Sequence, residues 1–375
     1  MNSSNNTLMT TNDSMIFNKP EIFTEPGGYQ FRSFESFYKW DRHKNSENVK
    51  KTLPAYTDNE DCLLNCEELD DGYEIKITKS GKFLTDIHAA SYFIPFIVGT
   101  QGLTKKEIEM STRTKLRIPK HPQNNILITG NNERDVAYAR NRIHMIILAQ
   151  REKHQMTHFI SIRVFSSSIK ENFETFRHNI LNGPSSRGIH PSIFQKAEKL
   201  HLTISPLVLL DDIEIDWAIS ALNECKNEVV KHLMENVDPP LYIQMEGVEI
   251  MNDDPTDVDI LYGKVKVDPE KYHSIFQTLV NKITTFFYLK GLIKRRYDDV
   301  KLHVTLMNSL YRKKDFRQQE DSIRESFDAT YILEKYKNYY FGVVELDFIH
   351  LSVRFGTTRN NGNSYYESLT SIPLY

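Results

Sequence analysis

Residues 199–204 read Lys-Leu-His-Leu-Thr-Ile, and residues 301–306 read Lys-Leu-His-Val-Thr-Leu. The two stretches share one pattern, Lys-Leu-His-apolar-Thr-apolar, whose alternation of polar and apolar positions is typical of a half-buried β-strand. Because successive side chains of a strand point to opposite faces, His201 and Thr203 share one face while the apolar positions between them point into the core. The sequence therefore predicts two equivalent strands that line one groove between two pseudo-equivalent halves of a domain.

The paired histidines, His201 and His303, have a chemical use because imidazole titrates near neutrality. One copy can accept a proton while the other donates one, and cleavage of a phosphodiester needs both steps. The hydroxyls of Thr203 and Thr305 can hydrogen-bond the non-bridging oxygens as negative charge builds on them. This scheme requires no metal ion and no other cofactor. We therefore expect these four side chains to form the catalytic site of a metal-independent phosphodiesterase.

A single His-x-Thr is usually no more than two polar positions on an exposed strand, and the repeat argues against that interpretation here. A third stretch, residues 349–352, also places a histidine and a hydroxyl on one strand face, at His350 and Ser352. It lacks the Lys-Leu prefix and has serine in place of threonine. Three interpretations of His350 remain open: a member of the active pair, a neighbour of the groove, or a core residue.

The paired elements resemble the two-histidine phosphoesterase superfamily, which includes RNA ligase-like and cyclic phosphodiesterase proteins and the A-kinase anchoring protein nuclear-localisation domain. By this resemblance, the catalytic roles fall on His201, Thr203, His303 and Thr305, and the substrate is a cyclic phosphate or a 2′,5′- or 3′,5′-linked nucleotide. The resemblance also implies a domain of two pseudo-repeated α/β lobes.

The elements around the repeats indicate a domain from residue 155 to residue 375. Strands interleave with amphipathic helices, which is typical of an α+β architecture. We expect strands over residues 159–165, 200–210, 241–251, 258–267 and 302–308, with one more within 343–355. We expect helices over residues 169–181 and 269–288, and a third after Asp211-Asp212 that carries Ile213, Trp217, Ala221 and Leu222 on its inner face.

The segment from residue 73 to residue 153 has a different order: strand, helix, turn, helix, strand, strand, helix. Its turn is Gly99-Thr100-Gln101-Gly102, and the glycines allow backbone conformations that end a helix. Asn132 is placed to cap the long last helix. One stripe of that helix holds Val136, Ala139, Ile143 and Ile147. The other expected elements are strands over residues 81–87, 115–118 and 126–129 and helices over residues 89–98 and 103–111.

This order resembles a type I KH domain (βααββα), in which a Gly-x-x-Gly loop and its flanking helices clamp a short run of single-stranded RNA backbone. The middle positions of the loop depart from the family pattern, which commonly has Lys or Arg there. Two lysines just after the loop are expected to substitute. A KH fold that serves protein contacts is the alternative. The resemblance implies RNA-binding residues at Gly99, Thr100, Gln101, Gly102, Lys105 and Lys106.

The charge distribution favours a polyanionic partner for this segment. The whole chain carries a formal net charge of −3, but residues 73–153 hold 14 Lys or Arg against seven Asp or Glu, a net charge of +7. Residues 51–72 hold seven acids and one lysine, a net charge of −6. A basic block of domain size points to nucleic acid, and a solvated basic surface is the alternative.

Residues 1–72 are expected to be largely disordered, since polar residues dominate and Pro and Gly interrupt any periodic pattern. Residues 29–40 are an exception, because six aromatic residues there predict docking onto a protein surface. The first 13 residues predict no secretory signal peptide, and no apolar run is long enough to predict a transmembrane helix. The three cysteines are expected to be reduced thiols and not metal ligands; they are Cys62, Cys66 and Cys225.

A KH domain followed by a two-histidine phosphoesterase domain is similar to the subunit 1 family of the activating signal cointegrator 1 complex. The likeness extends over about residues 73–355. It is carried by residues 192–195, 199–204, 208–210, 251–255, 258–262 and 301–308. It implies an RNA-binding subunit of a nuclear complex for transcription coactivation and DNA-alkylation repair. The implied partners are single-stranded RNA or a nucleotide, and the helicase and zinc-finger subunits of that complex. The alternative is a non-catalytic scaffold that binds RNA or nucleotide and recruits the helicase-complex partners. Nuclear localisation is expected, with the cytoplasm left open, and no membrane association.

Overall fold

The computed structural model describes residues 73–119, 125–293, 299–312, 324–356 and 365–375, and the backbone of the short strands β1 (Glu21–Thr24) and β2 (Gln30–Ser33). The chain divides into two compact units, residues 1–58 and 59–375. Within the first unit, β1 and β2 pair antiparallel, which the sequence did not predict. The aromatic cluster of residues 29–40 and the cysteines Cys62 and Cys66 lie outside the residues whose side chains are described.

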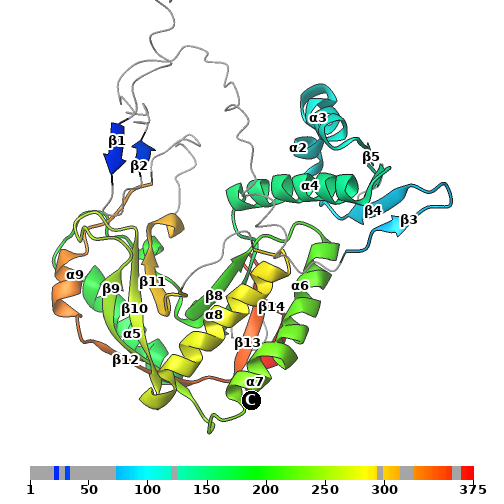
Figure 1. Ribbon diagram of the computed structural model, residues 1–375. Coiled ribbons are helices and arrows are strands. Elements are labelled where there is room, and N and C mark those ends of the chain that lie inside the picture. Colours follow the sequence, from blue (N-terminus) through cyan, green and yellow to red (C-terminus); the bar gives the residue numbers. More distant parts are fainter. Residues whose placement is uncertain are drawn as a thin grey trace, which may run out of the picture. The chain divides into compact units, whose positions relative to one another are not determined.

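Residues 73–153 form the βααββα order that the sequence predicts, with one extra strand at the edge. The elements are β3 (Lys76–Ile77), β4 (Phe83–Ile87), α2 (Ile94–Val98), α3 (Leu103–Thr112), β5 (Thr114–Arg117), β6 (Ile126–Gly130) and α4 (Glu133–Lys153). The strands form one antiparallel sheet in the order β3-β4-β6-β5. Helix α4 packs along β4 and β6 (Figure 1). The type I KH fold is confirmed.

The long helix α4 buries the predicted stripe. Its residues Val136, Ala139 and Ile143 are fully buried and Ile147 nearly so, all within the KH core. Asn132 holds the N-cap position, but its side chain donates a hydrogen bond to the carboxylate of Asp135 at 3.0 Å and accepts no backbone N–H. The predicted capping position is therefore right, and the predicted capping bond is wrong.

Helix α2 is shorter than predicted, because it begins at Ile94 and not at residue 89. Pro95 lies in its first turn. Proline lacks an N–H and clashes with the carbonyl four residues before it, so it suits the first turn of a helix and breaks the interior. A helix that began at residue 89 would have placed Pro95 in its interior.

Eight strands from residue 158 onwards form one antiparallel sheet in the order β12-β9-β10-β11-β8-β7-β13-β14. They are β7 (His158–Arg163), β8 (His201–Leu207), β9 (Tyr242–Ile250), β10 (Ile260–Asp268), β11 (His303–Asn308), β12 (Tyr340–Glu345), β13 (Phe348–Val353) and β14 (Glu367–Pro373). Two four-stranded halves meet where β8 pairs with β11 (Figure 1). This arrangement confirms the two-lobed α+β domain.

Helices cover one face of this sheet and form the core with it. The long ones are α5 (Ser167–Leu181), α6 (Asp212–Cys225) and α8 (His273–Leu289). Helix α5 packs against β12, α6 against β14, and α8 against β8 and β10 (Figure 1). The shorter helices of this domain include α7 (Lys231–Met234) and α9 (Thr330–Lys335). The opposite face of the sheet carries the polar residues of β8 and β11.

The first turn of α6 differs from the prediction. Ala221 and Leu222 are buried as expected, but Ile213 is 39% exposed and Trp217 is only half-buried. Glu214 is buried in place of Ile213, because it pairs with an arginine of the KH segment. A charged residue on the inner face of a helix cannot be anticipated from hydrophobic periodicity alone.

Residues 343–355, predicted to contain one strand, belong to two. β12 ends at Glu345 and pairs with β9, whereas β13 begins at Phe348 and pairs with β7 in the other half of the sheet. β14 pairs with β13 and was not predicted. The C-terminal part of the chain therefore adds strands to both halves.

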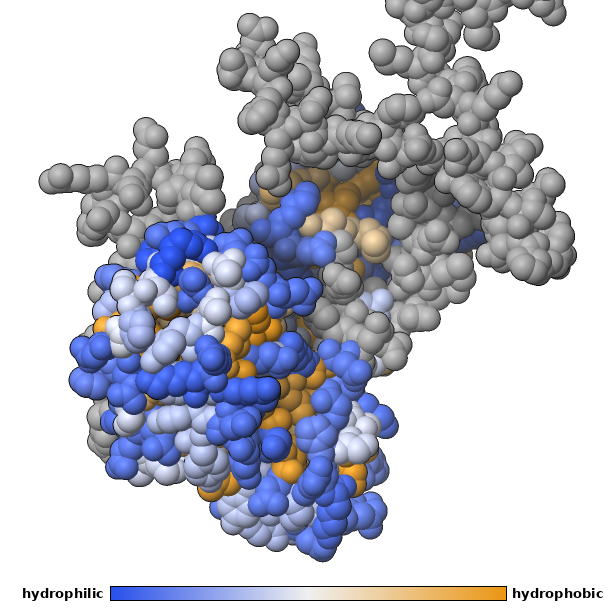
Figure 2. All heavy atoms as spheres, turned by 90° about the vertical axis from the view of Figure 1, so that its left-hand side faces the viewer, coloured by the Kyte–Doolittle hydropathy of each residue, from blue (hydrophilic) through white to orange (hydrophobic). Residues whose placement is uncertain are grey.

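The surface on the face shown in Figure 2 is mainly hydrophilic where it is described, with hydrophobic residues gathered in a band. The mean hydropathy of the chain is −0.49. Among the described residues, no helix has the length and apolar character needed to cross a membrane.

Candidate functional site: paired histidines and a glycine loop

The two repeated motifs meet at the centre of the sheet, where Leu202 of β8 lies opposite Val304 of β11 in an antiparallel pair. Leu202, Val304 and their neighbours Leu200 and Leu306 are completely buried. The apolar positions of both motifs therefore point into the core, as the alternation predicts. The polar positions point to the other side, which we call the histidine face and define by His201, Thr203, His303 and Thr305.

The register of this strand pair determines how the four side chains face one another. Counting outward from the central pair, His201 lies opposite Thr305, and His303 lies opposite Thr203. The two histidines are thus diagonal neighbours across the pair, with a backbone separation of about 7–8 Å. A phosphate between them can meet an imidazole from each side and a hydroxyl from each motif.

Both imidazoles are held in the same way. The Nδ1 atom of His201 lies 2.7 Å from the carbonyl oxygen of Lys199, and Nδ1 of His303 lies 2.7 Å from the carbonyl oxygen of Lys301. A carbonyl oxygen can only accept, so each Nδ1 carries the hydrogen. In the neutral imidazoles, each Nε2 is therefore the atom that can take up a proton.

A lysine and a tyrosine flank each histidine. Lys199 Nζ lies 4.4 Å from the centre of the Tyr366 ring, and that ring packs edge-on to His201 with centres 5.2 Å apart. In the second motif, Lys301 Nζ lies 4.7 Å from the centre of the Tyr262 ring, whose centre is 5.5 Å from that of His303. The repeated Lys-Leu prefix of the sequence thus has a structural counterpart.

The second tyrosine is anchored through its hydroxyl. Tyr262 donates a hydrogen bond of 2.5 Å to the carboxylate of Glu249 on the neighbouring strand β9. On the other side, the amide of Gln195 donates to the hydroxyl oxygen of Tyr311 at 3.0 Å and to that of Tyr366 at 3.5 Å. These bonds fix the rings against which the histidines pack.

Both histidines are shifted toward the neutral form. Burial lowers the pKa of His201 to about 4, against a weaker opposing effect of its bond to the Lys199 carbonyl, and the nearby His303 adds to the lowering. Burial also lowers the pKa of His303. In the free protein, both imidazoles are therefore neutral at pH 7 and ready to accept a proton at Nε2.

Cationic side chains stand on the strands beside each histidine. Arg163 of β7 lies opposite His201, and Lys264 of β10 lies opposite His303. With Lys199 and Lys301, they make the histidine face attractive to anions. Within the described ranges, no group of three or more His, Cys, Asp or Glu side chains is placed to hold a metal ion.

His350 lies on the same face of the sheet but not between the two motifs. It stands opposite Ser161 on β7, which lies opposite Thr203 on β8. One strand therefore separates it from His201. Of the three interpretations of His350, the geometry corresponds to a neighbour of the paired histidines. Ser352 is completely buried and lies near the hydroxyl of Ser161 at 3.4 Å.

The glycine loop of the KH domain adopts backbone conformations that favour glycine. Gly99, Gln101 and Gly102 have φ values of 72°, 54° and 76°. A side chain at Gly99 would place its Cβ 2.2 Å from the hydroxyl oxygen of Thr104, so this position admits only glycine. A Cβ at Gly102 would meet nothing within 4 Å. The loop is therefore open on the side of Gly102.

The two lysines after this loop differ in their surroundings. Lys105 is half-buried and lies 3.9 Å from the carboxylate of Glu109, one helical turn further along. Lys106 is exposed, as are Thr100 and Gln101 of the loop. Leu103, 63% exposed, offers an apolar surface beside them. Lys106 is thus the better placed of the two predicted cations to meet a phosphate.

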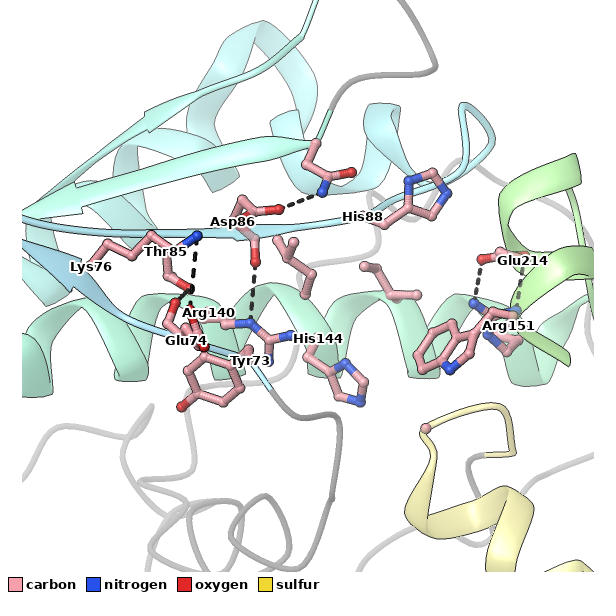
Figure 3. Close-up of a pocket in the computed structure, with 15 residues that line it drawn as sticks. Tyr73, Glu74, Lys76, Thr85, Asp86, His88, Arg140, His144, Arg151 and Glu214 are labelled. Atoms are coloured by element: carbon pink, nitrogen blue, oxygen red, sulfur yellow. Dashed lines mark hydrogen bonds and ion pairs between the residues drawn. The ribbon is translucent and has the colours of Figure 1, made fainter. Parts of the chain in front are cut away.

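A cavity of about 390 Å³ lies where the KH segment meets α6 (Figure 3). Its lining carries charges of both signs, including Asp86, Arg140 and the pair Arg151–Glu214. Neither His201 nor His303 lines it, so it is separate from the histidine face. The cavity therefore lies at the junction of the KH segment and the phosphoesterase-like segment.

Sequence reasoning placed the four motif residues but missed the side chains around them. In the sequence, the lysine prefix indicates only that the motif is repeated. Gln195 and Tyr262 lie in stretches that carried the resemblance, without a role assigned. Apart from its place on a predicted strand, nothing in the sequence indicates a role for Arg163. Tyr366 precedes a strand that the sequence does not predict.

Two family models match the chain. A KH domain model matches residues 85–145, and the model described as the AKAP7 2′5′ RNA ligase-like domain matches residues 156–374. Fold and site thus define a KH protein with a two-histidine phosphoesterase domain. A KH domain is a module for single-stranded nucleic acid.

A comparison over nearly the whole chain narrows this class of protein to one family. The chain is 36% identical over 358 residues to activating signal cointegrator 1 complex subunit 1 of Mus musculus, which covers 92% of this chain and 96% of the mouse protein. The chain belongs to the activating signal cointegrator 1 complex subunit 1 family.

Two further comparisons cover a smaller share of the chain. An uncharacterised protein of Schizosaccharomyces pombe is 25% identical over 217 residues, 58% of this chain and 95% of that protein. The crystal structure of the protein TT0787 of Thermus thermophilus is similar with a TM-score of 0.33 and 13% identity, and it covers 58% of this chain and 98% of that one.

Proposed function

We propose that the chain is an RNA-binding protein whose second domain cleaves RNA or nucleotide phosphodiesters without a metal ion. The observation that carries this proposal is the β8–β11 register, which sets His201 and His303 diagonally across one strand pair, each opposite the threonine of the other motif. We also propose the domain limits 73–153 and 155–375.

In the proposed reaction, His201 acts as the base. Its pKa is lowered to about 4, so it is neutral and its Nε2 can remove a proton from the attacking water or ribose hydroxyl. His303 acts as the acid and protonates the leaving oxygen. Thr203 and Thr305 donate hydrogen bonds to the non-bridging oxygens. The attacking oxygen forms a bond to phosphorus as the bond from phosphorus to the leaving oxygen breaks, while His201 gains one proton and His303 loses one.

His303 must carry a proton for this reaction. Burial lowers its pKa in the free protein, but a bound phosphodiester places a negative charge beside the imidazole, and an opposite charge raises the pKa of a histidine. Binding of the substrate therefore favours the protonated form of His303, which the acid step requires. Lys301, close to the same histidine in the chain, would offset part of this effect.

The KH domain would bind single-stranded RNA through residues 99–102. The supporting observations are the open side at Gly102, the exposed loop positions Thr100 and Gln101, and the exposed Lys106. Lys105 would contribute less, because Glu109 lies near it. The net charge of +7 on residues 73–153 would attract the phosphate backbone.

A second candidate function is a scaffold that binds RNA or nucleotide without turnover. One observation favours it: both imidazoles are neutral at pH 7 before a ligand arrives, so neither histidine of the resting site carries a proton to donate at Nε2. By kinship, we propose for either function a nuclear complex with helicase and zinc-finger subunits, in transcription coactivation and DNA-alkylation repair.

The test of the first function is turnover of a panel of 2′,3′-cyclic, 2′,5′-linked and 3′,5′-linked substrates by the full chain in excess chelator. His201→Ala and His303→Ala should each lose the activity. His232→Ala, on the exposed surface of α7, is the control for loss of an imidazole elsewhere. Activity that chelator abolishes and added metal restores would refute the metal-free mechanism. Binding without turnover anywhere in the panel would favour the scaffold.

A further inference from the structure

Arg163 has a charge that nothing in the proposed reaction uses. It lies opposite His201 on the adjacent strand, so its side chain belongs to the histidine face. Its guanidinium carbon lies 4.5 Å from the centre of the Phe165 ring and 5.0 Å from that of Tyr365. Ring faces stabilise a cation. The guanidinium is therefore held in place between two aromatic side chains.

The same guanidinium lacks hydrogen-bond acceptors. Its Nε and Nη2 atoms are buried, and no acceptor among the described residues is within reach of either. Buried N–H groups are nearly always paired, and an unpaired one costs free energy. Aromatic faces replace only part of what a hydrogen bond supplies. The missing partner is thus an acceptor, and for a guanidinium the best acceptor is an anion with two oxygens.

His350 stands beside Arg163 on the next strand. It lies opposite Ser161, two residues before Arg163, so the two residues are diagonal neighbours with a backbone separation of about 7–8 Å. The Nδ1 atom of His350 lies 3.2 Å from the hydroxyl of Ser368. Burial lowers its pKa, the charge of Asp347 opposes this, and the charge of Arg163 adds to the lowering. The guanidinium is therefore close enough to His350 to act on it.

We propose that Arg163 and His350 form a second phosphate-binding subsite, next to the one between His201 and His303. This inference rests on the proposed phosphodiesterase function and narrows its substrate to nucleotides or oligonucleotides with at least two phosphates. The two subsites are one to two strand spacings apart, about 5–10 Å. Neighbouring phosphates of an extended single strand are separated by a similar distance.

The subsite gives the ligand a direction across the sheet. Arg163 lies on β7 and His350 on β13, so both are on the β8 side of the paired histidines, away from β10. A nucleotide chain that places one phosphodiester between the histidines would continue over β7 toward β13. A mononucleoside cyclic phosphate would leave this part of the face empty.

The experiment compares adenosine dinucleotides that differ by one phosphate. The probes are 3′,5′-linked 2′-O-methyl ApA, pApA and ApAp, titrated against the full chain and checked afterwards for cleavage. One of the two phosphorylated probes should bind at least about tenfold more tightly than ApA, as expected for hydrogen bonds to a charged group. Arg163→Gln should weaken binding of the phosphorylated probe more than binding of ApA, and so remove this difference.

Three variants complete the design. Arg163→Lys keeps the positive charge but loses the paired N–H donors of the guanidinium, and it should retain only part of the preference. His350→Asn changes the other residue of the subsite, on the neighbouring strand β13, and should also reduce the preference. It tests the subsite even if Arg163→Gln does not fold. Arg177→Gln is the matched control, because Arg177 lies on α5, which packs against the opposite face.

The outcomes separate the two proposals. A phosphate preference that survives Arg163→Gln and His350→Asn would overturn the subsite and leave the proposed function standing. Equal binding of all three probes by the unaltered chain would do the same. No binding of any probe would overturn the proposed function and the subsite together. An equal loss in Arg177→Gln would reduce the preference to a general charge effect and overturn the subsite.

Discussion

Arg151, near the end of α4, and Glu214, in the first turn of α6, form an ion pair of 2.6 Å with both side chains buried (Figure 3). Each partner has further bonds: Arg151 donates to the carbonyl oxygen of Val208, and Glu214 accepts from the backbone N–H of Leu210 at 2.8 Å. A second contact, 2.8 Å between His88 and Asp211, also joins the two segments. The KH segment and the phosphoesterase-like segment are therefore connected through polar groups.

Glu214→Ala is expected to destabilise the protein by about 3–5 kcal/mol, because it leaves Arg151 buried without its partner. Urea unfolding followed by tryptophan fluorescence measures this, since Trp217 lies in the same helix. Glu174→Ala is the control, because Glu174 pairs with Arg177 at a surface where it is 45% exposed. Equal effects of the two substitutions would show that the buried pair stabilises the protein no more than a surface pair does.

The two histidines should behave as one unit in kinetics. Each single alanine substitution is expected to reduce the rate by about 10²–10⁴. The double substitution should cost much less than the product of the two, because half of an acid–base couple is of little use alone. Thr203→Val and Thr305→Val should have smaller effects, since each removes one hydrogen bond. A fully multiplicative double variant would contradict the coupling.

The pH dependence of kcat/KM follows from the lowered pKa values of the free protein. Activity should fall at low pH as His201 becomes protonated, with a pKa of about 4, and fall at higher pH as His303 loses its proton. The maximum is therefore expected on the acid side of the ordinary histidine pKa of about 6.5. A maximum of kcat/KM above about pH 7 would contradict the burial of the imidazoles.

Stability should also depend on pH through His201. Its pKa is lower in the folded protein than in the unfolded chain, so between pH 6.5 and about 4 the unfolded chain takes up a proton that the folded protein does not. The contribution of this group is complete above about pH 6.5 and falls with decreasing pH, by up to about 1.4 kcal/mol per unit. His201→Gln should reduce that slope in urea unfolding, whereas His232→Gln should not.

RNA binding by the KH domain is expected to be weak and strongly dependent on salt. Contact with about three phosphates predicts that log K falls by about 2 per decade of salt concentration. Gly102→Asp should abolish binding, because it places a carboxylate on the open side of the loop. Gly81→Asp is the matched control, since Gly81 has a similar φ of 74° and equally open surroundings. Unchanged affinity in Gly102→Asp would exclude this loop as the RNA site.

Local periodicity determined most of the elements and the four motif residues. Alternation over residues 199–204 and 301–306 predicts which side chains are buried, because the two faces of a strand are decided by neighbours in sequence. The stripe on α4 was equally predictable. Pro95 shows the limit of this reasoning: the residues before it are apolar enough for a helix, but the proline restricts where the helix can begin.

Tertiary structure alone decided what surrounds the histidines and how the domains join. The diagonal arrangement of His201 and His303 depends on the register of two strands that lie far apart in the chain, which no local pattern contains. Arg163 reaches the same face only because β7 pairs with β8. Glu214 occupies an inner helical position only because Arg151 meets it there. Polar groups can be buried where a distant partner compensates them, and that partner is specified by the fold and not by neighbouring residues.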